Sequence, residues 1–312
     1  MDATARQGQG TLAAPKRRRR WGDRYDGRLL RSLDPLYQLI PYIMKTRSDA
    51  QNLFEERIDV TAVEDWLRAQ RAAGRNVSFL HAFLAAYVRT ISQRPRMNRF
   101  IAGRRIYARN EILVSFALKK RLREDSPETV VKLKFEPTAT VWDVQKAVDE
   151  AIAANKQETA QNDTDLTAKL FMFLPGLVIR FAVWFLNLLD QRGLLPKVIH
   201  RVSPFHTSVF VTDLGSLGVK PIYHHLYEFG STSVFLAFGA KERERVVDEE
   251  GNATVKKTIG LKVVTDERIC DGYDYVYAFK YFVRLFRHPE ELEAPPAGVV
   301  EAVCDGVEAG AR

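Results

Sequence analysis

The stretch "VVTDERICDG" (residues 263–272) is the part of the sequence that most strongly indicates the fold of this chain. Its apolar start is typical of a strand, and its polar end is typical of a turn. Acidic and basic side chains follow one another in that turn, from Asp266 to Asp271. Such groups at the end of a strand either perform acid–base chemistry or order the turn, so the stretch is a candidate active site.

Strand and helix patterns alternate on both sides of this stretch, which predicts one α/β domain. Helices are expected after Thr61 and Ser78, from Thr140 to about Lys156, and over 273–292. Thr61 is followed by Glu64 at the spacing of a capping box. Strands are expected at 54–61, 104–108, 111–120, 128–137, 207–215, 231–247 and 253–266, the last two joined by the turn "DEEGN" (248–252).

The chain has 312 residues, enough for one large domain or two small ones with a sizeable core. Since no linker is visible, we expect one domain over 25–292, between a disordered basic tail (1–24) and a flexible acidic tail (293–312). Residues 1–31 contain nine Lys and Arg against three acids, whereas 289–312 contain one Arg against six acids. The region between them is mildly basic and has no concentrated stripe.

The basic run "KRRRR" (16–20) fits nucleic acid, an anionic surface or a solvated tail, and the solvated tail is favoured. No zinc finger or aromatic-interleaved basic motif accompanies it, so no nucleic-acid partner is expected. The only cysteines are Cys270 and Cys304, which excludes a disulfide framework. A buried structural role is favoured for Cys270 over that of a nucleophile. Without an apolar N-terminal leader, the sequence predicts a cytoplasmic protein.

Three short motifs and one glycine resemble those of a single family when they are read in order. That family ends a long strand with D-H-R-x-x-D-G, which looks like "DERICDG" (266–272). Its S/T-N-L-G looks like "TDLG" (212–215), followed by Gly218, and its P-x-x-N looks like "PRMN" (95–98). From about residue 40 to 292 the chain therefore resembles the catalytic domain of the dihydrolipoyl acyltransferases, the core component of 2-oxo acid dehydrogenase complexes.

This resemblance implies a chloramphenicol-acetyltransferase-like fold, a two-layer α/β sandwich with a mixed sheet and helices. It also implies a homotrimer with active sites between subunits, and coenzyme A as a co-substrate that exchanges an acyl group with a thiol or another acceptor. In the family, the motif histidine accepts the proton of a thiol, and the hydroxyl of S/T-N-L-G donates to the oxyanion. Thr212 keeps that hydroxyl here, and Asp271 keeps the last aspartate, which usually orders the turn.

The sequence departs from the family where the catalytic histidine is replaced by Glu267. A carboxylate is a weaker base than imidazole by roughly two pKa units, which costs ~10-fold in rate at a Brønsted slope near one half. Two interpretations remain open for Glu267: an altered catalytic base, or a surface or ion-pairing residue, with neighbouring Arg268 as a candidate partner. The protein is correspondingly an acyltransferase with an altered base, or an inactive homologue that acts as a structural or binding subunit.

Two adjacent histidines in "IYHHLYEF" (222–229) are candidates for substrate binding or for a substitute base. By the family's order, His224 and His225 lie near the acyl-binding region. Because adjacent side chains in an extended segment point to opposite sides, at most one of them faces a site. No metal site is expected, since the other histidines lack carboxylates or cysteines at ligand spacing. Those histidines include His200, His206 and His288.

A second departure is an apolar helical insert at about 165–205, where the family has a short connection. Within it, residues 170–189 are apolar over a length that could cross a bilayer. Pro175, Gly176 and Arg180 argue against a membrane span and favour a buried or lid helix, with contact at a membrane surface as an alternative. No lipoyl domain is expected ahead of the family-like region in this chain.

Overall fold

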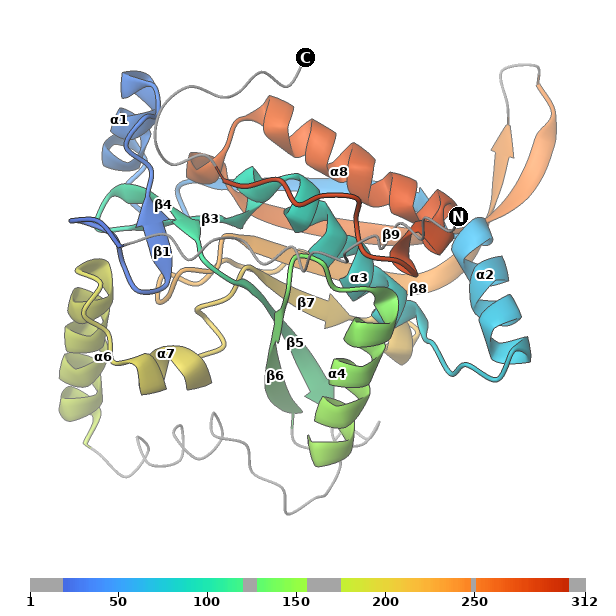
Figure 1. Ribbon diagram of the computed structural model, residues 1–312, viewed down its shortest axis with the longest axis horizontal. Helices are drawn as coiled ribbons and strands as arrows, with labels where there is room; N and C mark the ends of the chain where they lie inside the picture. The colour runs from blue at the N-terminus through green and yellow to red at the C-terminus, as the bar shows by residue number, and fades with distance from the viewer. Residues whose placement is uncertain (1–18, 120–127, 156–174, 248–250, 303–312) are drawn as a thin grey trace, which may run out of the picture.

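The computed structural model describes residues 19–119, 128–155, 175–247 and 251–302, folded around two β-sheets (Figure 1). The strands are β1 (Gly27–Leu29), β2 (Gln51–Asp59), β3 (Arg99–Ala102), β4 (Arg105–Arg109), β5 (Ile112–Lys119), β6 (Glu128–Phe135), β7 (Val209–Asp213), β8 (Val234–Val247) and β9 (Ala253–Asp266). The helices are α1 (Pro35–Ile43), α2 (Thr61–Ala72), α3 (Phe79–Gln93), α4 (Val141–Asn155), α6 (Gly176–Gln191), α7 (Lys197–Val202) and α8 (Gly272–Arg287). Short 3-10 helices are η1 (Pro95–Asn98), η2 (Gly215–Leu217), η3 (Glu267–Ile269) and η4 (Pro289–Leu292).

The larger sheet has six strands in the order β2-β9-β8-β7-β5-β6 and is mixed. Strand β7 lies parallel to β5 and β8, and the other neighbours are antiparallel. The smaller sheet has the order β1-β4-β3. The predicted mixed α/β sandwich is therefore confirmed, although the small sheet's outer strands, β1 and β3, were not anticipated because they have only three and four residues.

The helices begin at capping residues that were only partly recognised in the sequence. Ser78 caps α3 as expected, and His81 completes the box by accepting the amide proton of Ser78 through Nδ1 at 3.1 Å. The capping box predicted at Thr61 is wrong, because Val60 is the cap residue of α2 and no side chain caps it. Glu64 turns instead to Lys241 of β8 and forms an ion pair with it.

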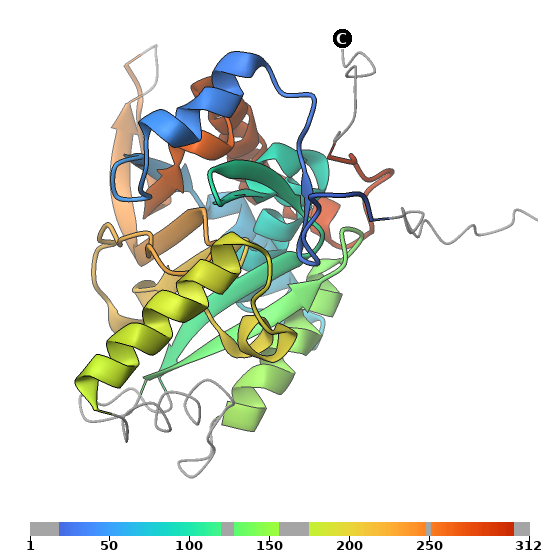
Figure 2. The ribbon, with the colours of Figure 1, turned by 90° about the vertical axis from the view of Figure 1, so that its left-hand side faces the viewer.

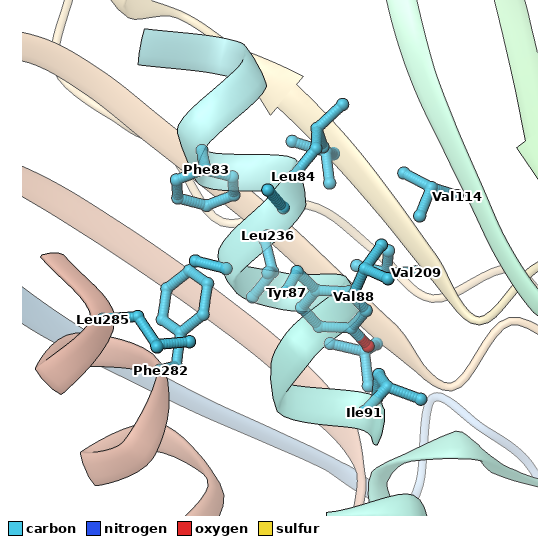
Figure 3. Close-up of a cluster of buried hydrophobic side chains, with 14 of the residues drawn as sticks. Phe83, Leu84, Tyr87, Val88, Ile91, Val114, Val209, Leu236, Phe282 and Leu285 are labelled. Atoms are coloured by element: carbon cyan, nitrogen blue, oxygen red, sulfur yellow. The ribbon is translucent and has the colours of Figure 1, made fainter. Parts of the chain in front are cut away.

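Helices α2, α3, α4 and α8 pack against the large sheet and enclose the main core. Figure 3 shows side chains of α3 and α8 that meet the strands in this core. Phe83 of α3 is fully buried there, with its ring centroid 4.5 Å from Phe238 of β8 and 5.2 Å from Phe282 of α8. Alternate strand residues supply the sheet's contribution, among them Val209 and Leu236. This core explains why the helical and strand periodicities of the sequence predict the fold well.

Helix α6 departs from the expectation of a buried or lid helix. Its apolar side chains face solvent, with Leu177 79% exposed, Phe181 63% and Trp184 57%. None of the residues of α6 belongs to the described core clusters. Within the described part of the chain, no helix is long and apolar enough to cross a membrane. The first residues of the predicted apolar span, 170–174, lie outside the described residues.

Buried charges hold the C-terminal end of α6 to the segment before β1. Arg24 Nη2 lies 2.7 Å from Asp190 Oδ1, and Arg24 also pairs with Asp26 at 2.8 Å. His206 Nε2 lies 3.2 Å from the other oxygen of Asp190, and His200 Nε2 lies 3.3 Å from Asp26. All five side chains are buried, so this network fixes α6 and α7 to the domain.

The two ends of the described chain also differ from the loose tails that the sequence suggests. Arg24 is buried within the predicted basic tail. At the other end, residues 293–302 run along α3, where Val300 donates its amide proton to Ser92 at 3.0 Å and Arg89 donates to the carbonyl of Ala294 at 2.5 Å. Contacts between residues far apart in sequence therefore order both segments.

Replacing Phe83 by alanine should lower the free energy of unfolding by about 3–5 kcal/mol, because it opens a cavity among packed rings. Val255→Ala is a matched control, since Val255 is 68% exposed and should change stability by less than ~0.5 kcal/mol. Urea denaturation followed by circular dichroism measures both. A Phe83→Ala loss as small as the control's would contradict the assigned core.

Acidification should destabilise the fold through the buried histidines. Burial lowers the pKa of His206 from its ordinary 6.5 to about 4. The unfolded chain therefore takes up a proton near pH 6.5 that the folded chain takes up only near pH 4, so stability falls as the pH drops through this window. Urea denaturation at pH 7 and pH 5 measures the fall.

His206→Gln should reduce that pH dependence, whereas His288→Gln should leave it intact because His288 is largely exposed. Equal free energies of unfolding for the wild type at pH 7 and pH 5 would contradict a buried neutral His206.

Candidate functional site

The turn after β9 is held by a buried ion pair inside the motif itself. Arg268 Nε lies 2.8 Å from Asp266 Oδ1, and its Nη2 lies 2.8 Å from Oδ2, so the guanidinium and the carboxylate meet in a two-point contact. Asp266 is fully buried and Arg268 nearly so. The carbonyl of Asp266 also accepts the hydroxyl proton of Tyr275 at 2.7 Å. Arg268 therefore pairs with Asp266, and the suggested pairing with Glu267 is wrong.

Glu267 is the exposed member of this turn. Its backbone amide donates to the carbonyl of Ala50 at 2.8 Å, which fixes the start of η3 against β2. Its side chain is exposed to solvent, between the buried Asp266 and the buried Arg268. No side chain among the described residues donates a hydrogen bond to its carboxylate. The turn therefore presents a free carboxylate on a rigid backbone.

Asp271 orders the residues that follow. It is the N-terminal cap of α8, and its Oδ1 accepts the amide proton of Asp274 at 2.8 Å. Its Oδ2 accepts the hydroxyl proton of Tyr37 from α1 at 2.9 Å. Burial opposes ionisation of Asp271, but these hydrogen bonds lower its pKa overall. Asp271 is ionised near neutral pH and fixes the end of the turn, while its catalytic role stays a prediction.

The early motif "PRMN" packs directly on this turn. Arg96 Nη1 lies 3.1 Å from Asp274 in the first turn of α8. The next residue, Met97, accepts a weak hydrogen bond from Cys270, with the sulfur atoms 3.8 Å apart. Burial raises the pKa of the Cys270 thiol, so this cysteine is an unreactive core residue at neutral pH. Two motifs that lie far apart in the sequence thus form one rigid unit.

Thr212 and Glu267 are separated both along the strands and across the large sheet. Thr212 on β7 is opposite Ala237 on β8, which is opposite Lys262 on β9. From Lys262, strand β9 continues for four residues to Asp266, which lies about 13 Å further along the strand. Strand β9 is also two strands away from β7, a separation of ~10 Å across the sheet. One chain therefore does not bring Thr212 and Glu267 together.

The turn after Thr212 is shaped by close backbone contacts. A Cβ atom on Gly215 would lie 2.7 Å from the carbonyl oxygen of Gly239, so only glycine fits there. Gly218 has a φ of 73° and closes the turn in the left-handed region. Asp213 Oδ1 accepts the amide proton of Ser216 at 2.9 Å, and burial raises the pKa of this carboxyl. These contacts hold the end of β7 in one conformation.

The two adjacent histidines lie in different environments. His224 is half-buried and stacks on Phe235 of β8, with ring centroids 4.4 Å apart, whereas His225 is exposed. Phe235 stacks in turn on Phe210, two residues before Thr212. Because alternate residues share a side of the strand, His224 and Thr212 lie on the same face of the sheet, opposite the main helices.

Two residues of this region gave no recognisable signal in the sequence. Tyr37 lies on a helix that the periodicity did not predict, so its contact with Asp271 was missed. Arg47 is buried between the motif turn and the histidine loop, 3.8 Å from Asp266 and within hydrogen-bonding distance of the carbonyls of Tyr227 and Gly230. Across the described ranges, no group of His, Cys, Asp and Glu side chains could hold a metal ion.

Comparison with known proteins places this geometry within one fold. No family model matches the sequence, and no curated protein resembles it at the level of sequence. Among solved structures, a probable dihydrolipoamide acetyltransferase from Listeria monocytogenes is similar with a TM-score of 0.54 and 13% identity, covering 82% of this chain and 93% of that one. The dihydrolipoamide acetyltransferase of Azotobacter vinelandii has a TM-score of 0.53 and 14% identity, covering 82% and 88%.

A chloramphenicol acetyltransferase is similar as well, with a TM-score of 0.51 and 11% identity over 80% of this chain and 94% of that chain. At such low identities the comparison establishes the fold. The chain has the chloramphenicol-acetyltransferase-like fold that its motifs predict.

Arg268→Gln should destabilise the fold by about 3–5 kcal/mol, because it leaves the buried Asp266 carboxylate without its close partner. Arg287→Gln is the control, since Arg287 is exposed on α8 and should change stability by less than ~0.5 kcal/mol. Thermal or urea unfolding measures the two variants side by side. Equal stability of Arg268→Gln and the control would show that the ion pair does not hold the turn.

Proposed function

We propose that this chain is a coenzyme-A-dependent acyltransferase whose active site forms between two copies, with Glu267 of one copy facing Thr212 of the next. The observation that carries the proposal is the arrangement of the motif turn. Its buried members, Asp266 and Arg268, form an ion pair, Asp271 caps α8, and the Glu267 carboxylate is exposed to solvent. A turn fixed on both sides of one free carboxylate suits a general base.

In the proposed reaction, the Glu267 carboxylate accepts the proton of a thiol. The resulting thiolate attacks the carbonyl carbon of the acyl group, and the Thr212 hydroxyl donates a hydrogen bond to the oxyanion that develops. Collapse of the tetrahedral intermediate releases the other thiol, or another leaving group, which takes the proton back from Glu267. Coenzyme A takes part as a co-substrate, with either its free thiol attacking or its thioester being attacked.

The distances within one chain support a site between copies. Thr212 and the end of β9 are separated by about 13 Å along the sheet and ~10 Å across it, too far for one reacting group to touch both. Coenzyme A and acceptor would therefore meet where two subunits join. Such a site needs at least two copies, and we propose a homotrimer because that is the arrangement that the family resemblance implies.

A second candidate function is that of an inactive binding or structural subunit. The replacement of an imidazole by Glu267 favours it, because a carboxylate on a flexible side chain positions a proton acceptor less rigidly than a ring nitrogen. Under this alternative, the rigid turn serves only the fold and the assembly.

Glu267→Gln should abolish acyl transfer from acetyl-coenzyme A while leaving the fold intact, because the amide cannot accept the thiol proton. Release of free coenzyme A in the presence of thiol, amine and hydroxyl acceptors measures the activity, and circular dichroism verifies folding. Glu56→Gln is the matched control, since Glu56 is an exposed glutamate on the neighbouring strand β2.

Two further variants separate the alternatives. Glu267→His should retain or raise activity if the rest of the site is intact. If His224→Gln abolishes transfer while Glu267→Gln does not, His224 is the base instead. A wild-type protein that transfers no acyl group to any of these acceptors would support the inactive binding subunit.

A further inference from the structure

Helix α6 carries an apolar stripe that faces away from the domain. Leu177, Phe181 and Trp184 follow one another at helical spacing and are all more than half exposed. Phe181 stacks on Phe185 with their ring centroids 6.1 Å apart, and it also contacts Trp184 at 5.7 Å. Exposed aromatic side chains gathered on one helix mark an interaction surface rather than scattered surface residues.

Helix α1 repeats this pattern on the same side of the molecule (Figure 2). Its exposed apolar side chains are Leu36, Leu39, Tyr42 and Ile43. The turn between β3 and β4 connects the two helices, because Arg104 lies 5.6 Å from the ring centroid of Tyr42 and Gly103 donates its amide proton to Gln191 of α6. We call the surface made by α1, the β3–β4 turn and α6 the α1–α6 face.

Positive charges prevail around the α6 part of the α1–α6 face, whereas acids adjoin α1, where Tyr37 donates to Asp271 and Asp49 is exposed. Asp34 is the one exposed acid in α1, its cap, the β3–β4 turn, α6 and α7 as the structure describes them, while Asp190 is buried and paired with Arg24. Exposed cationic side chains in these segments and next to them are Lys45, Arg104, Arg105, Arg180, Arg192, Lys197 and Arg201. The α6 part of this face therefore fits a partner that is apolar in its middle and negatively charged around it.

We propose that the α1–α6 face docks on an anionic lipid bilayer, with α6 lying in the plane of the headgroups. Aromatic and aliphatic side chains on one side of a helix, with Lys and Arg at its borders, are what interfacial helices use to bind membranes. Anionic headgroups attract the cations, and Phe181 and Trp184 enter the boundary of the acyl chains. The buried pair of Arg24 and Asp190 holds the end of α6 and keeps the face pointing outward.

A bilayer fits this face better than a second copy meeting it about a twofold axis. Such a contact between identical faces would bring the cations around α6 of one copy against those of the other. A bilayer offers a continuous layer of negative charge above an apolar interior, which matches both parts of the face at once.

Co-sedimentation of the full-length protein with vesicles tests the proposal. The wild type should bind vesicles of phosphatidylcholine with about one third phosphatidylserine, bind pure phosphatidylcholine weakly, and lose binding as salt is raised. The double variant Phe181→Ser/Trp184→Ser should lower the partition coefficient at least about tenfold, because it removes the inserted rings. Circular dichroism verifies folding.

Val247→Ser/Val255→Ser is the matched control. Both valines are more than 60% exposed, and they lie on the β8–β9 hairpin, away from this face, so binding should not change. Wild-type protein that binds neither kind of vesicle would overturn the proposal. So would unchanged binding of Phe181→Ser/Trp184→Ser, which would assign the interaction to the basic run at 16–20.

Light scattering tests whether the α1–α6 face is instead a contact between copies of the chain. If Phe181→Ser/Trp184→Ser breaks an oligomer into monomers while the wild type ignores vesicles, the face is a contact between copies and the proposal is wrong. The vesicle measurement needs no acyl transfer, so its failure and the failure of the proposed enzymatic function are distinguishable.

Discussion

The buried ion pair between Asp266 and Arg268 is the interaction on which the motif region depends. Two charges removed from water are tolerated only when their geometry is close and their remaining hydrogen bonds are satisfied. Here the guanidinium also donates to the carbonyl of Met44, and Arg47 approaches the same aspartate from the side of the histidine loop. The pair thus joins β9, the end of α1 and that loop, and it leaves Glu267 as the exposed residue of the turn.

A second set of buried charges fixes the apolar insert that contains α6, as the pair of Asp266 and Arg268 fixes the turn. Asp190 lies at the end of a helix whose side chains Leu177, Phe181 and Trp184 face outward, so buried charges help the half-buried residues of α6 to fix it. The hydrogen bond from His206 and the charge of Arg24 lower the pKa of Asp190 to about 2 although burial opposes ionisation. The insert is therefore attached through polar contacts at one end, which leaves its apolar side available to a partner.

Most of the fold could be predicted from the sequence, because it follows from local periodicity. The apolar spacing of α3 and the alternation in β8 and β9 predicted elements close to the observed ones. The motif turn, with the other motifs in order, predicted the chloramphenicol-acetyltransferase-like fold. What the sequence could not provide were contacts between distant residues, such as Tyr37 with Asp271 and Arg24 with Asp190. The exposure of α6 was also missed, since an apolar helix pattern does not distinguish a core from an outer surface.

The central claim, acyl transfer at a site shared by two copies, is tested most directly by mixing two inactive variants. Glu267→Gln subunits lack the base and Thr212→Val subunits lack the hydroxyl, so each alone should be inactive. Refolded together in equal amounts, they should recover about a quarter of wild-type activity, since that fraction of interfaces pairs an intact Glu267 with an intact Thr212. A mixture that stays inactive while wild-type protein refolded in the same way is active would contradict the account.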